Sequence, residues 1–536
     1  MEKNLSSYQG GIILTACVGV LIDAVSIQRY IYSSNSLKQN IGASHLVEWV
    51  FDEQLAVSLK KVFGEDVNVN QWKDDVETIQ ILKNEMTKVE VGYCGGGNAL
   101  LLFKNSHDAI NFVQQWTKDL LVVAPHLRTA VAIGEIKIDN FQESLDILYK
   151  RLTKNKNSFF PNVDLHKESI VVEDSNTGFV ATVYDENEGF ISADSYTKTI
   201  GAELAQTYLL NRYKDVLKNT YTFTREISSL GQIEGNSHIA IVHIDGNNIG
   251  ERFKSCKTLI ERRNLSITIE KIVNQSFQEL LHYIIEDQMP YLEKEKSGFD
   301  IKKENGKKVL PIRPLILGGD DLTFVCDGRL GMIYAERLMK SMCENSKQYS
   351  AFKNNPLTSC AGVAITKTKY PFYRAYELSE NLCDLAKEKA RKYEGSWIDF
   401  HITYGGFSGE LSDIRNKHYK LNNGEQLHFG PYHLSSNDEK SLLNLKKGMI
   451  EFVEQWPKSK IKELRSALAS GREVSEAFLK DLKAKGYKLP KIIGSIDYSD
   501  NGWVDNETPY FDMIELIDFY PIQFLEEELL IERTEN

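Results

Sequence analysis

Two short acidic motifs carry the residue types best suited to chemistry. In the first, an apolar run at residues 315–317 leads into Gly318-Gly319-Asp320-Asp321, and a second apolar run follows, which predicts a β-hairpin with two carboxylates at its turn. Adjacent anions repel each other, and Mg²⁺ or Mn²⁺ supplies the missing charge while also taking waters and substrate phosphates as ligands. An exposed, Asp-rich hairpin tip is the plain alternative. The motif therefore predicts a metal site only if its surroundings agree.

The second acidic motif lies upstream. Residues 238–244 form an apolar run, predicted to be a strand, that ends at Asp245. A strand-end carboxylate beside a hairpin carboxylate is the arrangement of two-metal nucleotidyl-transfer sites. We therefore predict that Asp245 and Asp320 are catalytic metal ligands, that the Gly246 carbonyl is a further ligand, and that Asp321 also serves the metals by assisting or orienting them.

Residues able to contact a nucleotide flank these acids. Asn247, Asn248 and Gly250 follow the strand and open a helical pattern, so that backbone N–H groups and a helix N-terminus can face phosphate. Gly318 and Gly319 let a bulky triphosphate approach the backbone closely. These glycines and asparagines are predicted to bind the nucleotide.

The order of the elements around both motifs matches a palm domain. A strand ending in an acid, helices, the Gly-Gly-Asp-Asp hairpin, a core strand at residues 358–365 and a basic helical stretch at 373–393 follow one another. Residues 238–404 resemble the second palm (cyclase-like) domain of the large subunit of type III CRISPR effector complexes, and more distantly the GGDEF diguanylate cyclases. Residues 396–401 also resemble that subunit rather than a diguanylate cyclase.

This resemblance implies a nucleotidyltransferase that joins ATP into cyclic oligoadenylates with the help of Mg²⁺ or Mn²⁺. Related cyclases carry a triphosphate-binding lysine on the helix after the core strand. Lys387 is the better candidate for it and Lys389 is the reserve, while a solvated basic helix face is the alternative. The residues themselves do not select the base.

The first part of the chain repeats this pattern of a strand that ends in an acid, followed by a glycine-rich hairpin. Residues 11–22 form an apolar run that ends at Asp23, and residues 88–103 predict a second hairpin. Its turn reads Gly-Gly-Gly-Asn, so that Asn98 stands where a carboxylate would be, and an amide cannot supply the charge that a metal needs. The strand at 129–134 echoes the later core strand. We infer an internal duplication at an offset of roughly 220 residues, far above the period of solenoid repeats.

This first part resembles the first palm of the same CRISPR subunit, most closely at residues 23–31 and 33–38. In that family the first palm is the one that lacks the Gly-Gly-Asp-Asp carboxylates. We interpret it as a catalytically silent partner that closes the nucleotide site of the second palm. Ser33 and Ser34 are candidate contacts to a second nucleotide. A polar loop is the alternative for them, and a plain strand-end cap is the alternative for Asp23.

Composition limits the remaining choices. The 536 residues suggest two to four domains at roughly 150 residues each. Sixty-four basic against 75 acidic residues give a net charge of −11, so no global polycation is present to bind nucleic acid, although a local basic patch and RNA binding stay open. Seven scattered cysteines without a CxxC pair favour a reducing, cytoplasmic location. Residues 10–22 are too short to span a bilayer, so no membrane association is expected.

Two features of the CRISPR subunit are not expected here. The connecting region at residues 156–235 contains no cysteine, so we expect no structural zinc. The HD nuclease of that subunit would precede the first palm, where few residues stand. His107-Asp108 reads instead as an ordinary helix start, so we expect no HD nuclease.

The predicted fold class is α+β, with two ferredoxin-like palm (nucleotide cyclase-like) domains and a mainly helical C-terminal region. The predicted segments are a degenerate first palm at 1–155, a connector at 156–235, the second palm at 236–405 and the C-terminal region at 406–536. Short strands at 170–173 and 177–182 and a helix at 202–217 are predicted in the connector, a long helix at 266–292 in the second palm, and helices at 436–455, 459–469 and 474–484 in the C-terminal region.

The predicted function is that of a stand-alone cyclic-oligonucleotide synthase in anti-phage, CRISPR-like signalling, working as a homo-oligomer or with CRISPR-like partners. Two alternatives stay open. One is a diguanylate-type cyclase, which the Gly-Gly-Asp-Asp motif and the lack of an Arg-x-x-Asp inhibitory site disfavour. The other is a non-catalytic scaffold subunit that binds RNA or protein, which the intact acids Asp245 and Asp320 disfavour.

Overall fold

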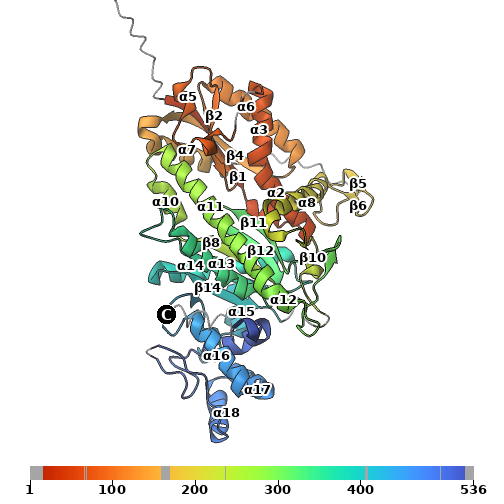
Figure 1. Cartoon of the computed structure of the whole chain (residues 1–536), viewed down its shortest axis with the longest axis vertical. Coiled ribbons are helices and arrows are strands. Elements are labelled where there is room, and N and C mark those ends of the chain that lie inside the picture. The colour runs from red at the N-terminus through yellow and green to blue at the C-terminus, as the bar shows by residue number, and fades with distance from the viewer. Residues whose placement is uncertain are drawn as a thin grey trace, which may run out of the picture. The chain divides into compact units, whose positions relative to one another are not determined.

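Two β-sheets that share the order of their first four strands organise the chain (Figure 1). The computed structural model describes residues 16–525 except 66, 68, 159–169, 234, 236, 405–408, 437 and 495. The first part of the strand predicted at 11–22 therefore lies outside the described residues. Within these described ranges, no helix is both long and apolar enough to cross a membrane.

The chain divides into two compact units, each assembled from separate segments. Unit 1 contains Met1–Ser33, Ile41–Leu204 and Asn248–Glu270, and unit 2 contains Ser34–Asn40, Ala205–Asn247 and Lys271–Asn536. The predicted boundaries near residues 155, 235 and 405 stay predictions, because this division follows the contacts of the chain rather than its linear order.

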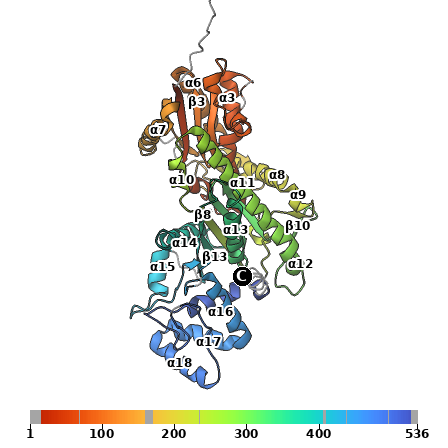
Figure 2. The same ribbon diagram turned by 60° about the vertical axis from the view of Figure 1, so that its left-hand side comes forward.

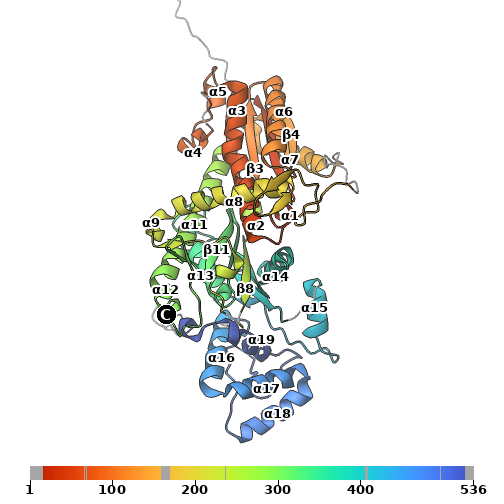
Figure 3. The ribbon, with the colours of Figure 1, turned by 90° about the vertical axis from the view of Figure 1, so that its right-hand side faces the viewer.

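The sheet of unit 1 consists of β1 (Ala16–Val25), β2 (Val89–Gly95), β3 (Asn98–Phe103) and β4 (Arg128–Lys137), in the order β2-β3-β1-β4 with antiparallel pairs. Helix α6 (Ser106–Val123) joins β3 to β4, and α7 (Phe141–Lys156) packs against β4 and β1. Strand β1 takes a central place in the sheet, and the middle of its apolar run, Val20–Ile22, is fully buried. We call this sheet with α6 and α7 palm one (Figure 3).

The sheet of unit 2 consists of β8 (His238–Gly246), β11 (Ile312–Gly318), β12 (Asp321–Asp327), β13 (Ser359–Lys367), β14 (Trp397–Ile402) and β15 (Tyr432–His433), in the order β11-β12-β8-β13-β14-β15. All neighbours are antiparallel except β13 and β14. Helices α13 (Gly331–Ser346) and α14 (Phe372–Tyr393) pack on it (Figure 2). We call β8 and β11–β13 with these two helices palm two.

The two helices of palm two cover opposite faces of the sheet. A Cβ at Gly362 would lie 1.9 Å from the Ser379 carbonyl oxygen of α14, whereas a Cβ at Gly331 of α13 would meet Ala240 and Val363. Because successive strand residues point to opposite faces, Gly362 and Val363 mark the two sides. The glycine therefore allows α14 to approach the sheet closely.

The strand orders β2-β3-β1-β4 and β11-β12-β8-β13 correspond one to one, with β1 matching β8 and the hairpin β2–β3 matching β11–β12. The chain order strand, helix, hairpin, helix, strand is that of the ferredoxin-like β-α-β-β-α-β motif. The prediction of two ferredoxin-like palms is therefore confirmed, and their equal strand order agrees with the inferred internal duplication.

The connecting segments differ in detail from the prediction. Residues 170–182, all of them described, form no strand but a single bridge between Glu173 and Val180, and the hairpin of β5 (Val183–Asp185) and β6 (Gly189–Ile191) follows. The predicted helix at 202–217 is instead α8 (Ala193–Arg212) and a separate turn, α9 (Lys214–Leu217). The strands predicted at 170–173 and 177–182 are wrong because short apolar runs do not reveal whether a partner strand is present.

The long helix predicted at 266–292 is α11 (Leu259–Tyr283), extended by a π-helical turn at Ile284–Gln288 and by α12 (Met289–Leu292). The C-terminal region is mainly helical, as predicted, and its described helices are α15 (Leu411–His418), α16 (Leu442–Gln455), α17 (Lys458–Ala469), α18 (Arg472–Ala484) and α19 (Tyr510–Leu516). Helix α16 begins later than predicted because Ser441 caps it, its hydroxyl accepting from the Leu443 amide at 3.1 Å.

A buried ionic network joins the C-terminal region to the sheet of palm two. His428 lies between two carboxylates, with Nε2 3.0 Å from Asp399 on β14 and Nδ1 3.2 Å from Asp512 on α19. Arg415 of α15 contacts Asp399 with both terminal nitrogens, and the Tyr432 hydroxyl donates to Asp512 at 2.7 Å. Burial and Arg415 lower the pKa of His428, but the two carboxylates outweigh them and raise it to about 9. The network therefore contains a charged imidazole at neutral pH.

Candidate functional site

Strands β8 and β12 bring two of the predicted acids face to face. Asp245 and Asp321 are direct partners in the antiparallel ladder, and two residues further His243 and Thr323 are partners as well. Directly opposite residues and residues two apart share one face of a sheet. All four side chains therefore lie on one face of palm two, which is the face that α14 covers, because His243 also pairs with Gly362. We call this the acidic face.

The hairpin turn places Asp320 beside the end of β8. Gly319 adopts a left-handed conformation with φ of 61°, which a residue with a side chain rarely tolerates. The Asp320 carbonyl then accepts a hydrogen bond from the Gly246 amide at 3.1 Å, which ties the turn to the strand end that carries Asp245. A Cβ at Gly318 or Gly319 would meet no other atom within 4 Å, so the space next to the turn is open, as a bulky ligand requires.

The acids of the turn are held in an unfavourable electrostatic setting. Burial raises the pKa of Asp320 to about 7, with the charges of Asp245 and Asp321 adding to the effect and Lys387 opposing it. Burial also raises the pKa of Asp321 to about 7, again with help from Asp245. Oδ1 of Asp321 is buried without a hydrogen bond, although His243 Nδ1 lies 3.3 Å away. The acidic face is thus short of positive charge.

Helix α14 supplies one cation to this face. Lys387 Nζ lies 2.5 Å from Asp245 Oδ2 and 3.6 Å from Asp384 on the preceding turn of the helix. Burial lowers the pKa of Lys387, but the Asp245 carboxylate outweighs this and raises it above its ordinary value, so the ammonium stays charged. Lys389 has different neighbours: burial and then the Lys440 cation lower its pKa. Only Lys387, of the two predicted lysines, contacts a predicted acid.

Sequence reasoning missed three polar residues next to the acids. His243, Glu380 and Asp384 all interact electrostatically with one another, and Glu380 also feels the charge of Asp321. Burial first, and then Asp384 and Asp321, raise the pKa of Glu380. Their spacing holds the signal that could have found them, because His243 precedes Asp245 by two strand residues and Glu380 and Asp384 precede Lys387 by whole helical turns.

Asn247, the first residue of the predicted phosphate loop, makes hydrogen bonds within the protein. The Asn247 amide donates to Thr358 Oγ1 and to the Gly395 carbonyl, both at 3.1 Å, and its backbone amide donates to the Thr358 carbonyl at 2.8 Å. Asn248 takes a left-handed conformation and precedes α10 (Ile249–Ser255), which also contains Gly250. Asn248 and Gly250 belong to unit 1, whereas Asn247 belongs to unit 2. Contacts between this loop and phosphate stay predictions.

The two serines predicted to contact a second nucleotide are also engaged within the protein. The Ser33 hydroxyl donates to the Tyr30 carbonyl at 3.1 Å and accepts from buried Lys198 at 2.8 Å. Ser34 is buried, and its hydroxyl accepts from the Ser36 amide at 3.1 Å. Both side chains stabilise the local loop, and their role toward a nucleotide stays a prediction.

The side chains around Asp321 fit a divalent metal that brings further ligands of its own. Among the described residues, no three or more His, Cys, Asp or Glu side chains form a group ready to hold a metal ion. Mg²⁺ does not require such a cage, because it is commonly bound by one or two carboxylates together with waters and substrate phosphates. The buried, unbonded Oδ1 of Asp321 and the surplus of negative charge fit a cation that arrives with its nucleotide.

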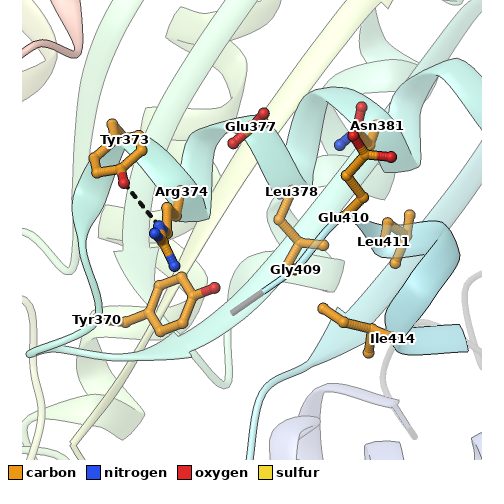
Figure 4. Close-up of a pocket in the computed structure, with 10 residues that line it drawn as sticks. All are labelled: Tyr370, Tyr373, Arg374, Glu377, Leu378, Asn381, Gly409, Glu410, Leu411 and Ile414. Atoms are coloured by element: carbon orange, nitrogen blue, oxygen red, sulfur yellow. Dashed lines mark hydrogen bonds between the residues drawn. The ribbon is translucent and has the colours of Figure 1, made fainter. Parts of the chain in front are cut away.

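A separate hollow of about 280 Å³ lies between the first turns of α14 and α15 (Figure 4). Figure 4 shows Arg374 between Tyr370 and Tyr373, and its Nε donates to the Tyr373 hydroxyl at 2.7 Å. The described residues that line it include none of the predicted site residues. The hollow therefore adds nothing to the acidic face.

A ferredoxin-like palm with acids at a strand end and at the adjoining hairpin defines the class of this domain. Residues 238–394 match the family model of the second palm domain of Cas10/Cmr2. Palm two is therefore similar to the second palm domain of Cas10/Cmr2, which confirms the predicted resemblance for this part of the chain. No curated protein matches the sequence.

Several solved structures are similar to the whole chain at low sequence identity. A Csm1–Csm4 cassette in complex with cA4 is 15% identical, with a TM-score of 0.47, and the match covers 94% of this chain and 70% of that one. The same cassette in complex with one ATP is 13% identical, with a TM-score of 0.47 and coverage of 94% and 70%. Csm1 from T. onnurineus is 14% identical, with a TM-score of 0.47 and coverage of 94% and 69%. The assignment of palm two rests on the family model alone.

Proposed function

We propose that palm two is the catalytic domain of a metal-dependent nucleotidyltransferase that joins ATP into a cyclic oligoadenylate signal, as part of a CRISPR-like defence. The observation that carries the proposal is the cross-strand pair of Asp245 and Asp321 beside Asp320, in a setting that leaves the two hairpin acids short of positive charge. The resemblance of the domain to Cas10 supports the choice of ATP. Partners within a CRISPR-like complex stay a prediction.

The chain's own residues divide the work of this reaction. Asp245, Asp320 and Asp321 would hold Mg²⁺ or Mn²⁺, which when bound supplies charge to the reacting phosphate and acidity to the attacking 3′-hydroxyl. Lys387, already 2.5 Å from Asp245, carries a positive charge that can neutralise the leaving pyrophosphate. The open space beside Gly318 and Gly319 admits the triphosphate. Binding and orientation of charge, rather than proton transfer by a side chain, would account for catalysis.

The proposal is tested by incubating the purified protein with each nucleoside triphosphate and Mg²⁺ or Mn²⁺, and by resolving the products by mass. We expect oligoadenylates from ATP and no product from the other nucleoside triphosphates. We expect the Asp320→Ala and Asp321→Ala variants to make no oligoadenylates. Lys392→Ala, a change on the exposed end of α14, is the matched control and should retain activity. Products from GTP would favour a diguanylate-type cyclase, and tight RNA binding without turnover would favour a scaffold; either result overturns the proposal.

A further inference from the structure

His243 stands directly behind the catalytic acids on the acidic face. Its side chain is almost fully buried, at 5% exposure, and its Nδ1 lies 3.3 Å from Asp321 Oδ1 and 3.2 Å from Thr323 Oγ1. We propose that His243 is a positioning residue: its Nδ1 faces Asp321 Oδ1 without a hydrogen bond in this structure, and it donates to that carboxylate and fixes it when the metal binds. The inference rests on the proposed function, because it concerns the same metal site.

The surroundings of the imidazole hold it in place. The ring of Tyr376 on α14 meets the imidazole edge to face, with centroids 5.7 Å apart and an interplanar angle of 78°. Gly362, the β13 partner of His243, has no side chain, which lets α14 press Tyr376 onto the ring. An ionised carboxylate oxygen facing Nδ1 favours the tautomer that carries its proton there, because a carboxylate can only accept and the Thr323 hydroxyl can accept as well. A fixed ring can therefore fix the acid.

In palm one, the hairpin has no carboxylate at the position of Asp321, and the positions that correspond to His243 and Thr323 can be compared. Asp23 pairs with Asn98 as Asp245 pairs with Asp321, and two residues further Leu21 pairs with Leu100 where palm two has His243 and Thr323. Both leucines are fully buried. The fold thus accepts an apolar pair at these positions, and the polar pair occurs where the hairpin carries a carboxylate. This association favours a role for His243 in the site rather than in folding.

Palm one also suggests the variant that tests the inference. His243→Leu copies the residue that palm one already accommodates, so it is expected to fold. His243→Asn retains a donor, because the Asn Nδ2 occupies the place of the imidazole Nδ1, and it serves as the conservative rescue. Thr323→Val removes the hydroxyl next to Nδ1 without touching the donor. Each full-length variant is compared with the wild type by circular dichroism and thermal melting before any assay.

The main measurement is Mn²⁺ binding in the presence of a non-hydrolysable ATP analogue. Electron paramagnetic resonance of the free Mn²⁺ quantifies this binding. We expect His243→Leu to weaken Mn²⁺ binding about ten-fold or more, the value of one hydrogen bond to a charged group, and His243→Asn to restore most of it. In the turnover assay, the Leu variant should need more Mn²⁺ for half-maximal rate while its rate at saturating Mn²⁺ stays close to that of the wild type.

These measurements distinguish a failure of the positioning role of His243 from a failure of the proposed function. If the wild type turns ATP over and His243→Leu binds Mn²⁺ as tightly as the wild type, or if His243→Asn is as weak as the Leu variant, the positioning role is overturned and the proposed function stands. If the wild type binds Mn²⁺ with the analogue but makes no product from any nucleotide, the proposed function fails, while the Leu and Asn variants still decide the role of His243 by binding alone.

Discussion

Palm one and palm two share a topology but differ at the hairpin turn. In both, the strand-end acid pairs with a lysine from the helix after the last shared strand: Lys156 of α7 contacts Asp23, and Lys387 of α14 contacts Asp245. In both, the residue after the acid donates its amide to the turn, from Ala24 to the Gly97 carbonyl at 2.8 Å and from Gly246 to the Asp320 carbonyl at 3.1 Å. The Asp–Lys pair is therefore a property of the palm and not a mark of catalysis.

The register locates the difference between the palms residue by residue. Asn98 occupies the ladder position of Asp321, and Gly97, which accepts the equivalent hydrogen bond, occupies that of Asp320. Palm one therefore lacks both hairpin acids, as its Gly-Gly-Gly-Asn turn indicated. A metal site needs more negative charge than one strand-end acid that is already paired with a lysine can offer. Of the two turns, only that of palm two therefore has the acids that the proposed reaction needs.

Removing a hairpin acid should have the largest effect. Asp321→Asn keeps the shape of the side chain but removes its charge, and we expect turnover to fall on the order of 10³-fold, because metal stabilisation of the reacting phosphate is worth several kcal/mol. Asn98→Ala, the same ladder position in palm one, should retain wild-type turnover. Product formation from ATP, quantified by mass, measures both. An equal loss in the Asn98 variant would show that palm one is not silent.

The second prediction concerns the part of the sheet that palm one lacks. Strands β14 and β15 extend palm two toward the network of Asp399, His428 and Asp512. Because the carboxylates raise the pKa of His428 to about 9, above its unfolded value near 6.5, the imidazolium contributes stability of order 3 kcal/mol below pH 6.5, and this is lost as pH rises through 9.

Hydrogen exchange measured by mass spectrometry can follow this network locally in the whole chain. Peptides covering β14 and residues 428–432 should lose protection between pH 7 and 9, after correction for the intrinsic exchange rate. His428→Gln, which cannot gain a charge, should lower protection at pH 6 and flatten the pH dependence. Peptides from the sheet of palm one serve as the internal control, and the same loss there would contradict a local cause.

The sequence allowed the two palms, their strand-end acids Asp23 and Asp245 and the acidic turn of palm two to be predicted, because strands, hairpins and strand-end acids are local patterns. It did not reveal His243, whose partner Thr323 lies 80 residues away and whose place in an apolar run reads as core. The contacts of Asn247 within the protein were hidden for the same reason, since its partners Thr358 and Gly395 come from distant segments. Contacts across strands depend on register, which periodicity alone does not determine.

The third prediction tests why palm one cannot simply regain its acids. Gly97 has φ of 77°, and a Cβ there would lie 2.4 Å from Ile27 Cδ1. Gly97→Asp should therefore lower the free energy of unfolding by about 1–3 kcal/mol. Gly318→Ala in the turn of palm two meets no atom within 4 Å and has no left-handed backbone, so it should leave stability unchanged. Thermal melting compares the two, and equal melting temperatures would contradict a steric barrier at Gly97.

The smallest effect is expected from the lysine that palm one retains. Lys156→Met leaves Asp23 without its counter-ion, and burial already raises the pKa of that carboxyl despite Lys156. Because both side chains are partly exposed, we expect a loss of only about 1 kcal/mol in stability, with Mn²⁺ binding unchanged.

Lys387→Met in palm two should behave differently. It removes the cation that contacts Asp245, so Mn²⁺ binding in the absence of nucleotide should strengthen, while turnover of ATP should fall because the pyrophosphate loses its counter-charge. Electron paramagnetic resonance of free Mn²⁺ and the turnover assay separate the two effects. If Lys156→Met changes Mn²⁺ binding as much as Lys387→Met does, the two Asp–Lys pairs are functionally alike, and the turn is not what distinguishes the palms.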